Sequence, residues 1–184
     1  MAHDPPRVKH NFVLPAFSYE QPPNTQPYIR INMFFMKRKD ISWEYFESHW
    51  NHVHADIVTS SQAFKENKII RYTQFCQTAE SREHTKKCFP GYSVMEWDAA
   101  SEFWVEKPED MAAFLNSQEY IDSLREYYKY QSLDKELTHQ KADIDHFIEK
   151  DGGIRIMVGS HTLIYGQAVP GLGNDGVTSA DLRA

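Results

Sequence analysis

The run SWEYFESHWNHVHADIV (Ser42 to Val58) holds three histidines, and histidine is the side chain best suited to acid/base chemistry near neutral pH. His49, His52 and His54 allow three interpretations. They could bind a metal, one of them could transfer protons, or all three could lie on a hydrated helix face. Their placement on a helix separates these interpretations.

The spacing predicts that the three histidines diverge. At about 100° per residue the apolar residues form one stripe, with His54 at its edge and turned toward the core. His49 is expected on the opposite flank and His52 toward solvent. His49 and His52 could share a metal only with a third ligand from elsewhere. The run has no HxxxH or HExxH pattern, so we expect no metal site.

His54 is therefore the preferred proton-transfer candidate. The alternative is a core histidine whose hydrogen bonds are simply satisfied. Burial among aromatic rings and the nearby carboxylate of Asp56 act on the charge of an imidazole in opposite directions. An imidazole in this setting can serve as both general acid and general base.

Further candidates come from the predicted strands. Tyr72 alternates with Gln74, and Glu102 shares a strand face with Trp104. A Glu102 facing the helices would be a costly carboxylate unless paired or protonated; otherwise it is a solvated rim residue. The candidate substrate contacts are Trp50, His49, Phe35, Trp104, Asp98 and His146. A core role for Trp104, a turn role for Asp98 and a solvated helix end for His146 are the alternatives.

Composition sets the broad class. The chain has 184 residues, 41% of them hydrophobic and 14% aromatic, which suits one globular domain with a substantial core. A net charge of −6 argues against a nucleic-acid binder. No apolar run approaches the roughly 18 residues of a membrane helix, and the first residues carry no apolar signal core. With two cysteines, Cys76 and Cys88, we expect a reduced, cytoplasmic protein.

The chain divides into three predicted parts. Residues 1–27 hold six of the nine prolines and are expected to form an extended N-terminal arm. Residues 28–166 show regular periodicity and are expected to form the domain. Residues 167–184 are rich in glycine and are expected to form a flexible tail.

Strands and helices alternate within the domain. The patterns predict a strand at 28–37, a helix from Ser42 to about 59 and a strand at 68–77. A charged loop is expected at 79–91, followed by a strand at 92–106 with a possible break at 98–100. A helix is expected from Pro108, with a break near 116 and a restart at about 118–135, and then a strand at 154–159 that turns at 159–161 into TLIYG. This β-α-β-β-α-β order predicts an α+β, ferredoxin-like fold.

The first strand predicts a sheet that is apolar on both faces. Ile31 and Phe35 are expected on one face and Phe34 on the other, whereas the helices can cover only one. Two sheets packed face to face in a dimer would cover the second face. Cover by the N-terminal arm is the alternative.

Several chemistries lack their sequence motifs. No GxGxxG directly follows a predicted strand, and neither GxxxxGK[ST] nor a GxSxG nucleophile motif is present. Both cysteines are weak nucleophile candidates because no histidine-bearing motif surrounds them. We expect an enzyme of this composition to use side chains alone, without a cofactor.

Two blocks carry a family resemblance. MKRKDISWEYFESHWNHVHADIV resembles the opening of EthD domains, a strand with basic residues at its end and a helix closing with Trp-x-x-x-His. WDAASEFWVEKPEDMAAFLNSQEY resembles their second block. The blocks cover roughly residues 28–165. Within the family, the sequence resembles most the fungal members from polyketide clusters, in the runs MFFMKRK, RYTQF, EFWV and IRIMVG. These members include decarboxylases of the trypacidin-pathway type and dehydratases acting on naphthopyrone precursors.

The resemblance implies a homodimeric α/β barrel without a cofactor and a pocket between each sheet and its helices. It also implies proton transfer by the histidine at the end of the first helix, here His54, and a tyrosine partner, here Tyr72. Ala55-Asp56 replaces the Gly-Pro of many members, so Asp56 could orient His54 or simply end the helix.

The expected activity is that of a cofactor-free lyase, a decarboxylase or dehydratase, acting on an aromatic polyketide. Decarboxylation, dehydration and cyclisation share these motifs. A cyclase or isomerase using the same pocket, and a non-catalytic protein that shields a reactive intermediate, are therefore the alternatives.

Overall fold

The computed structural model describes residues 5–122 and 143–183, which fall into two compact units. One unit combines Met1–Pro27 with His161–Ala184, and the other is Tyr28–Ser160. The two chain ends are thus grouped together, whereas the sequence suggested a separate arm and tail. The three-part division itself stays a prediction.

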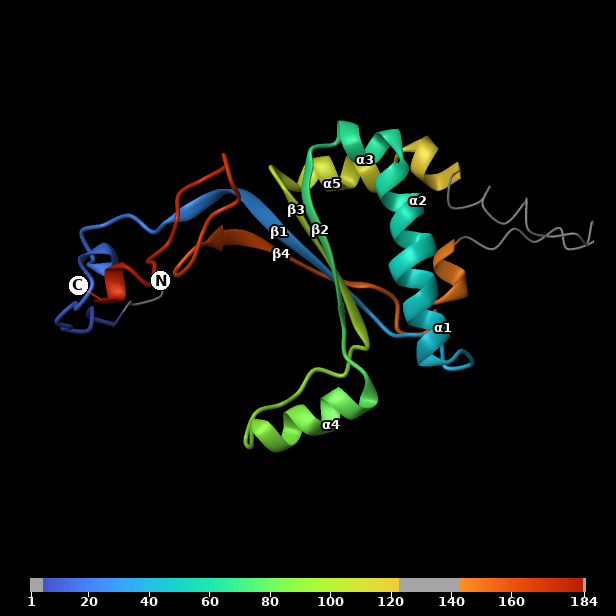
Figure 1. The fold of residues 1–184 in the computed structure, drawn as a ribbon, viewed down its shortest axis with the longest axis horizontal. Coiled ribbons are helices and arrows are strands. Elements are labelled where there is room, and N and C mark those ends of the chain that lie inside the picture. Colours follow the sequence, from blue (N-terminus) through green and yellow to red (C-terminus); the bar gives the residue numbers. More distant parts are fainter. Residues whose placement is uncertain (1–4, 123–142, 184) are drawn as a thin grey trace, which may run out of the picture. The chain divides into compact units, whose positions relative to one another are not determined.

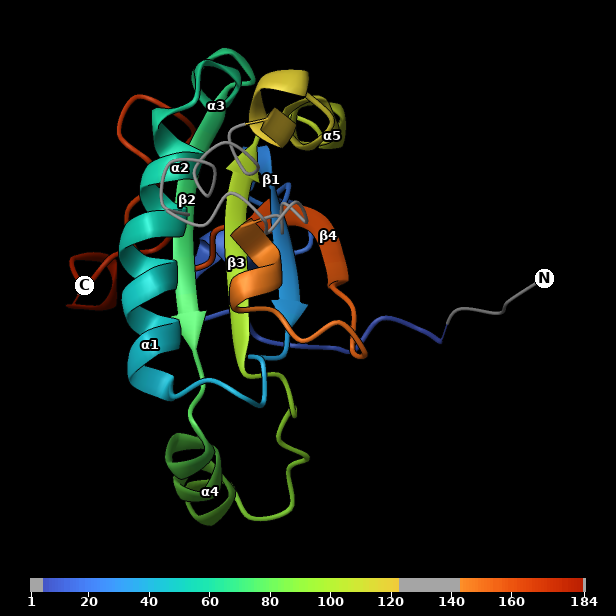
Figure 2. The same ribbon diagram turned by 90° about the vertical axis from the view of Figure 1, so that its right-hand side faces the viewer.

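A four-stranded sheet forms the framework. Its strands are β1 (Thr25–Phe35), β2 (Ile69–Cys76), β3 (Ala99–Val105) and β4 (Arg155–Thr162), in the spatial order β2-β3-β1-β4 (Figure 2). The central strand β3 is antiparallel to both β1 and β2, with Phe103 opposite Ile31 on one side and Tyr72 on the other.

One long helical segment covers a face of this sheet (Figure 1). It consists of α1 (Trp43–Ser48), a π-helix (His49–His54) and α2 (Ala55–Ser60). The Ser42 hydroxyl caps it by accepting from the backbone N–H of Tyr45 at 3.0 Å, as predicted for this N-cap position. The short helices α3 (Gln62–Glu66) and α5 (Pro108–Leu115) lie beyond its C-terminal end and add to the helical layer (Figure 1).

The core lies between the sheet and these helices. Ile31, Phe103 and Val105 project from the sheet, and the helices meet them with apolar residues. These partners are Ile57, Val58, Ala63, Met111 and Phe114. Alternate strand residues point to opposite faces, so Phe35 also faces the helices, as predicted. The element order and sheet topology confirm the α+β, ferredoxin-like fold.

Three local predictions were wrong. The charged segment after β2 is a helix, α4 (Ala79–Cys88), because Thr78 caps it and its long polar side chains favour a helix. Residues 92–97 are not a strand, and β3 begins only at Ala99. β4 passes through Gly159 without turning. The helix predicted at 118–135 is present at 118–122, and the remainder lies outside the described residues.

The segment between β2 and β3 forms an excursion, residues 77–98, that reaches beyond the ends of these strands (Figure 1). Its base is closed by polar contacts. The backbone N–H of Gln77 donates to the Asp98 carbonyl at 2.7 Å, and the Gln77 side chain donates to the carbonyls of Met95 and Trp97, both at 2.8 Å. The two ends of the excursion are therefore joined directly.

In the other unit, the side-chain amide of Asn24 joins segments that are far apart in the sequence. Nδ2 of Asn24 donates to the carbonyls of Leu163, Asn174 and Asp175 at 3.2, 3.1 and 2.9 Å. These bonds connect the segment before β1 with the segment after β4. No helix among the described residues has the length and apolar character that a membrane-spanning segment needs.

Candidate functional site

The site begins with an irregular turn of the long helix. In a regular α-helix, residues five positions apart are separated by about 140° around the axis. Between His49 and His54 the helix is instead a π-helix, in which the backbone N–H of Ala55 reaches the Trp50 carbonyl five residues earlier. This wider turn brings His49 and His54 to the same face. The prediction that they lie on opposite flanks was wrong because it assumed a regular helix.

Both histidines meet one buried carboxylate. Nε2 of His49 lies 2.8 Å from Oδ1 of Asp143, and Nδ1 of His54 lies 2.5 Å from Oδ2 of the same residue. Asp143 begins a short 3-10 helix, Asp143–His146, and is fully buried. Each carboxylate oxygen therefore has one imidazole N–H as a partner.

Asp143 is held in its charged form. Burial alone raises the pKa of this carboxyl, but the hydrogen bonds from His49 and His54 and their charges outweigh burial and lower the pKa well below its usual value. An ionised carboxylate only accepts hydrogen bonds. The proton between Asp143 and a neutral His54 therefore sits on Nδ1 of His54, and its Nε2 is left as the basic nitrogen.

The His54 ring is only 6% exposed and stands edge-on to Phe147, with ring centroids 5.0 Å apart. Its Nε2 makes no hydrogen bond with the residues that the structure describes. A ring that is fixed at one nitrogen, and whose other nitrogen has no hydrogen-bond partner among residues 5–122 and 143–183, has the geometry of a general base. The expected inward position of His54 is confirmed.

A second group of polar side chains lies on the same side of the sheet. Tyr72 stacks flat on Phe103, with centroids 4.4 Å apart. The amide of Gln74 donates to the Tyr72 hydroxyl at 2.7 Å and to the Trp50 carbonyl in the π-helix at 3.0 Å. Gln74 thus ties the Tyr72 side of the site to the turn that carries the histidines.

Phe35 and His146 also lie near this site. The Phe35 ring stands edge-on to Trp50 at 5.3 Å and belongs to a buried aromatic cluster with Phe46 and Phe147. The half-buried His146 stacks beside His49, with centroids 6.0 Å apart. The structure therefore brings together five of the candidates, namely His54, Tyr72, Trp50, His49 and Phe35, with His146 adjacent.

Two candidates lie on the other face of the sheet. Glu102 is paired with the Arg30 guanidinium and accepts from the Trp104 indole N–H at 2.7 Å. Trp104 in turn stacks on Tyr28, with centroids 5.0 Å apart, while the guanidinium of Arg71 lies 4.3 Å from the Trp104 ring centre. Glu102 is thus a paired carboxylate remote from the helices, and the sheet separates it from His54.

Asp98 has a structural position at the base of the excursion. Its carboxylate accepts from the Arg82 guanidinium at 2.8 Å and from the backbone N–H of Lys37 at 3.1 Å. These bonds tie α4 to the end of β1. Asp98 is buried, so it is more than the turn residue that the sequence suggested as an alternative.

Two important residues, Asp143 and Gln74, were missed by sequence reasoning. Asp143 lies in ADIDHFIEK, a segment considered only for His146, and it occupies the orienting position considered for Asp56, which is exposed. Gln74 was noted only for its alternation with Tyr72. The available signal for Asp143 was an acidic residue within an otherwise apolar segment, but nothing in the sequence linked it to a helix about 90 residues earlier.

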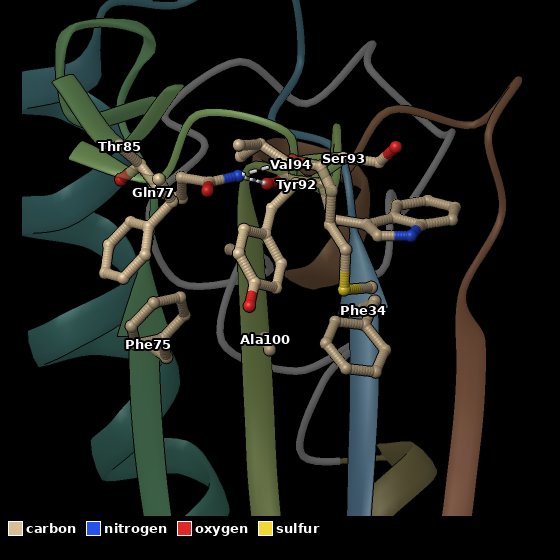
Figure 3. A pocket seen from close by; sticks show the side chains of 12 residues that line it. Phe34, Phe75, Gln77, Thr85, Tyr92, Ser93, Val94 and Ala100 are labelled. Atoms are coloured by element: carbon tan, nitrogen blue, oxygen red, sulfur yellow. Dashed lines mark hydrogen bonds between the residues drawn. The ribbon is translucent and has the colours of Figure 1, made fainter. Parts of the chain in front are cut away.

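A pocket of about 530 Å³ lies on the other face, between the sheet and the excursion (Figure 3). Its lining is mostly aromatic and apolar, including Phe34, Phe75, Phe89, Tyr92 and Trp97. Gln77 and Thr85 supply polar atoms at its edge. This pocket does not include the histidines.

The described residues hold no assembled metal site, and their one thiol–imidazole contact joins the exposed Cys88 to Nε2 of His84 at 3.4 Å in α4. Among residues 5–122 and 143–183, no three His, Cys, Asp or Glu side chains are arranged to hold a metal ion. Burial and the nearby Glu47 carboxylate raise the pKa of the Cys76 thiol to about 12, so this cysteine stays protonated and weakly nucleophilic.

Fold and site together define an α+β domain of ferredoxin-like topology with a histidine–aspartate pair between its sheet and helices. The EthD domain matches residues 38–151, more than half of the chain, so the chain belongs to the EthD family. This family assignment confirms the broad resemblance.

Comparison with solved structures gives distant matches. A dimeric ferredoxin-like protein of unknown function from Bacteroides fragilis NCTC 9343 is 11% identical, with a TM-score of 0.38, and the match covers 76% of this chain and 99% of that one. A dimeric ferredoxin-like protein of unknown function from Thermobifida fusca YX is 9% identical, with a TM-score of 0.38 and coverages of 74% and 91%. A Dabb family protein from Mesorhizobium loti MAFF303099 is 9% identical, with a TM-score of 0.39 and coverages of 74% and 97%. Comparison with curated proteins gives no match.

Proposed function

We propose that the chain is a cofactor-free lyase, a decarboxylase or dehydratase, in which His54 transfers protons. The observation that carries this proposal is the 2.5 Å contact between Nδ1 of His54 and the buried Asp143 carboxylate. This contact fixes the ring and the tautomer, and it stabilises the imidazolium that forms when Nε2 takes up a proton. Membership of the EthD family is compatible with an enzyme but does not choose the reaction.

Both reactions need one group that can hold and return a proton. In dehydration, Nε2 of His54 removes a proton next to a ketone, an enolate forms, and the imidazolium protonates the departing hydroxide as a carbon–carbon double bond is completed. In decarboxylation of a β-keto acid, the electrons of the broken carbon–carbon bond form the enolate as carbon dioxide leaves. The imidazolium, which formed when Nε2 of His54 took the carboxylic-acid proton of the substrate, then protonates the enolate carbon.

The proposed substrate is a flat aromatic polyketide. Phe147 supplies aromatic surface beside the His54 ring, and Tyr72 and Phe103 stack on each other on the same side of the sheet. Aromatic rings give large contact area to planar ligands at low entropic cost. The same surroundings would also suit a cyclase or a binding protein, so the experiment must separate these.

We also propose a homodimer in which the second sheet face meets its copy. In the single chain Phe75 is 65% exposed on this face, beside the apolar pocket lined by Phe34 and Phe89. Exposed apolar surface of this kind commonly marks an interface. The alternative cover, the N-terminal arm, predicts a monomer instead.

The decisive experiment compares His54→Gln with the wild type on an aromatic β-keto acid and an aromatic β-hydroxy ketone. A lyase lowers substrate mass by carbon dioxide or water, which mass spectrometry detects directly. We expect the substitution to reduce turnover by at least about 10²-fold. His52→Gln is the matched control, because His52 is exposed on the same π-helix and should leave turnover unchanged.

Two results would contradict the proposal. Product of unchanged mass would identify an isomerase or cyclase. Tight substrate binding without turnover, insensitive to His54→Gln, would identify a binding protein.

A further inference from the structure

The hydrogen bonds of Gln74 leave the Tyr72 hydroxyl with a proton to donate. Nε2 of Gln74 carries two hydrogens, and they are used on the Trp50 carbonyl at 3.0 Å and the Tyr72 hydroxyl oxygen at 2.7 Å. The Tyr72 oxygen is therefore an acceptor in this pair. Among the described residues, Tyr72 makes no hydrogen bond in which it is clearly the donor.

Other donors lie close to the same oxygen. The indole N–H of Trp50 is buried and forms no hydrogen bond of normal geometry with a described residue, yet it is near enough to lower the pKa of Tyr72. Burial is the largest influence and raises the pKa of the Tyr72 hydroxyl overall, while Gln74, Ser101 and Trp50 each lower it. The hydroxyl thus stays protonated, accepts from the Gln74 amide and has the Trp50 indole N–H nearby.

Such surroundings suit a hydroxyl group that donates its hydrogen bond to a developing anion. A hydroxyl that already accepts hydrogen bonds from its neighbours is polarised, and its own proton is turned away from them. A preorganised donor in a buried site stabilises negative charge on a substrate oxygen more strongly than water does. The chemistry proposed for His54 creates such a charge when a ketone becomes an enolate.

We propose that the Tyr72 hydroxyl binds the substrate carbonyl oxygen as it becomes an enolate, and that Gln74 is the positioning residue that aims this hydroxyl by bridging it to the π-helix. This proposal rests on the proposed function, because the enolate arises from proton removal or decarboxylation at His54. In that step the breaking carbon–hydrogen or carbon–carbon bond supplies the pair that forms the new double bond, and the carbonyl pair moves to the oxygen held by Tyr72.

The arrangement also explains why the π-helix and the sheet are coupled here. Gln74 binds the carbonyl of Trp50, which is also the acceptor of the Ala55 N–H in the π turn. The same backbone oxygen therefore anchors the turn that places His54 and the amide that places Tyr72.

The probe for this site is 4-nitrophenol, whose phenolate resembles an enolate and absorbs visible light, so that the bound phenol and phenolate can be distinguished. The measured quantity is the ratio of phenolate to phenol affinity. Hydrogen bonds to charged groups contribute about 1.5–3 kcal/mol, which corresponds to roughly tenfold or more in affinity. We therefore expect Tyr72→Phe and Gln74→Met each to lower the ratio about tenfold or more.

The controls separate positioning from general damage. Gln77→Met makes the same substitution just beyond the same strand, at the edge of the other pocket, and should leave the ratio unchanged. The double variant of Tyr72→Phe and Gln74→Met should match Tyr72→Phe alone, because Gln74 acts through Tyr72. A merely structural role of Gln74 would lower the affinity for phenol and phenolate equally and leave the ratio intact.

An unchanged ratio in Tyr72→Phe would overturn the proposal, as would a fall caused by Gln77→Met, which would place the phenol in the other pocket. His54→Gln separates this proposal from the function itself. If that variant keeps normal turnover, the lyase proposal fails, while the phenolate ratios still decide whether Tyr72 and Gln74 form an anion-binding site.

Discussion

At the scale of single residues, Asp143 determines what the histidines can do. Its two oxygens each accept from one imidazole, His49 at 2.8 Å and His54 at 2.5 Å. A buried carboxylate shared in this way fixes two ring orientations at once. Losing it would leave two buried N–H donors without an acceptor, which is costly.

Asp143→Asn tests this role through stability. Folding lowers the pKa of Asp143, so its stabilising contribution is complete above the unfolded value near pH 4 and is lost as the pH falls further, toward the folded value. We expect the variant to lose about 1–3 kcal/mol of unfolding free energy at pH 7. Below about pH 4, the unfolding free energy of the variant should fall less steeply with decreasing pH than that of the wild type, as measured by urea unfolding from pH 7 to 3.

Asp145→Asn is the matched control, since Asp145 lies in the same 3-10 helix but pairs at 3.2 Å with Lys150, which is largely exposed. A surface pair of this kind contributes about 0–1 kcal/mol. Equal losses in both variants would contradict a special role for Asp143.

The sequence predicted part of this site. His54 was identified because helical periodicity places it at the edge of an apolar stripe, and periodicity is a local property. Its partner could not be found in the same way. Asp143 is 89 residues away in the chain, and only the three-dimensional fold brings the two together.

At the scale of elements, the π-helix is the feature that local rules missed. The run from Ser42 to Ser60 has the capping and periodicity of one ordinary helix, and these signals predicted its ends correctly. They do not reveal one residue too many within a turn. That extra residue decides which side chains converge, so the helix was predictable whereas the pairing of His49 with His54 was not.

Deleting Asn51 tests this interpretation. Asn51 is exposed within the π-helix, and without it His49 and His54 would be four positions apart, which is one face of a regular α-helix. We expect the variant to fold, to keep both contacts with Asp143 and to change the unfolding free energy by no more than about 1 kcal/mol. Thermal unfolding and imidazole ¹⁵N spectra provide the measurement.

Deleting Ser48 is the comparison, because Ser48 is equally exposed but lies in the regular helix α1. Its removal would rotate the buried Phe46 out of the core, so a much larger loss of stability is expected. Similar stability losses in the two deletions would show that the π turn is not a local insertion.

At the scale of the whole molecule, the two faces of the sheet have different roles. One face packs on helices and carries the histidine site. The other carries the Arg30–Glu102 pair, Trp104 and an apolar pocket. The sequence predicted apolar residues on both faces, but it did not predict the charged pair in the middle of the second face, because pairing across strands depends on register.

Phe75→Asp tests whether this second face joins two copies. A carboxylate in an apolar interface would be desolvated without a partner, so we expect a wild-type dimer and a largely monomeric variant at micromolar concentration. Light scattering coupled to size exclusion measures the mass. Ala112→Asp adds the same charge to an exposed position on α5 and should leave the mass unchanged. A monomeric wild type would favour the N-terminal arm as the cover.

The closed base of the excursion also matters for handling the protein. Because Gln77 and Asp98 are bonded directly at 2.7 Å, the sheet does not depend on how much chain lies between them. The far end, near the exposed Gly91, is thus a place where an epitope or a dye-labelling sequence can be inserted. Such a tag would report on the protein without touching the histidine site, because the pocket beneath the excursion does not include the histidines.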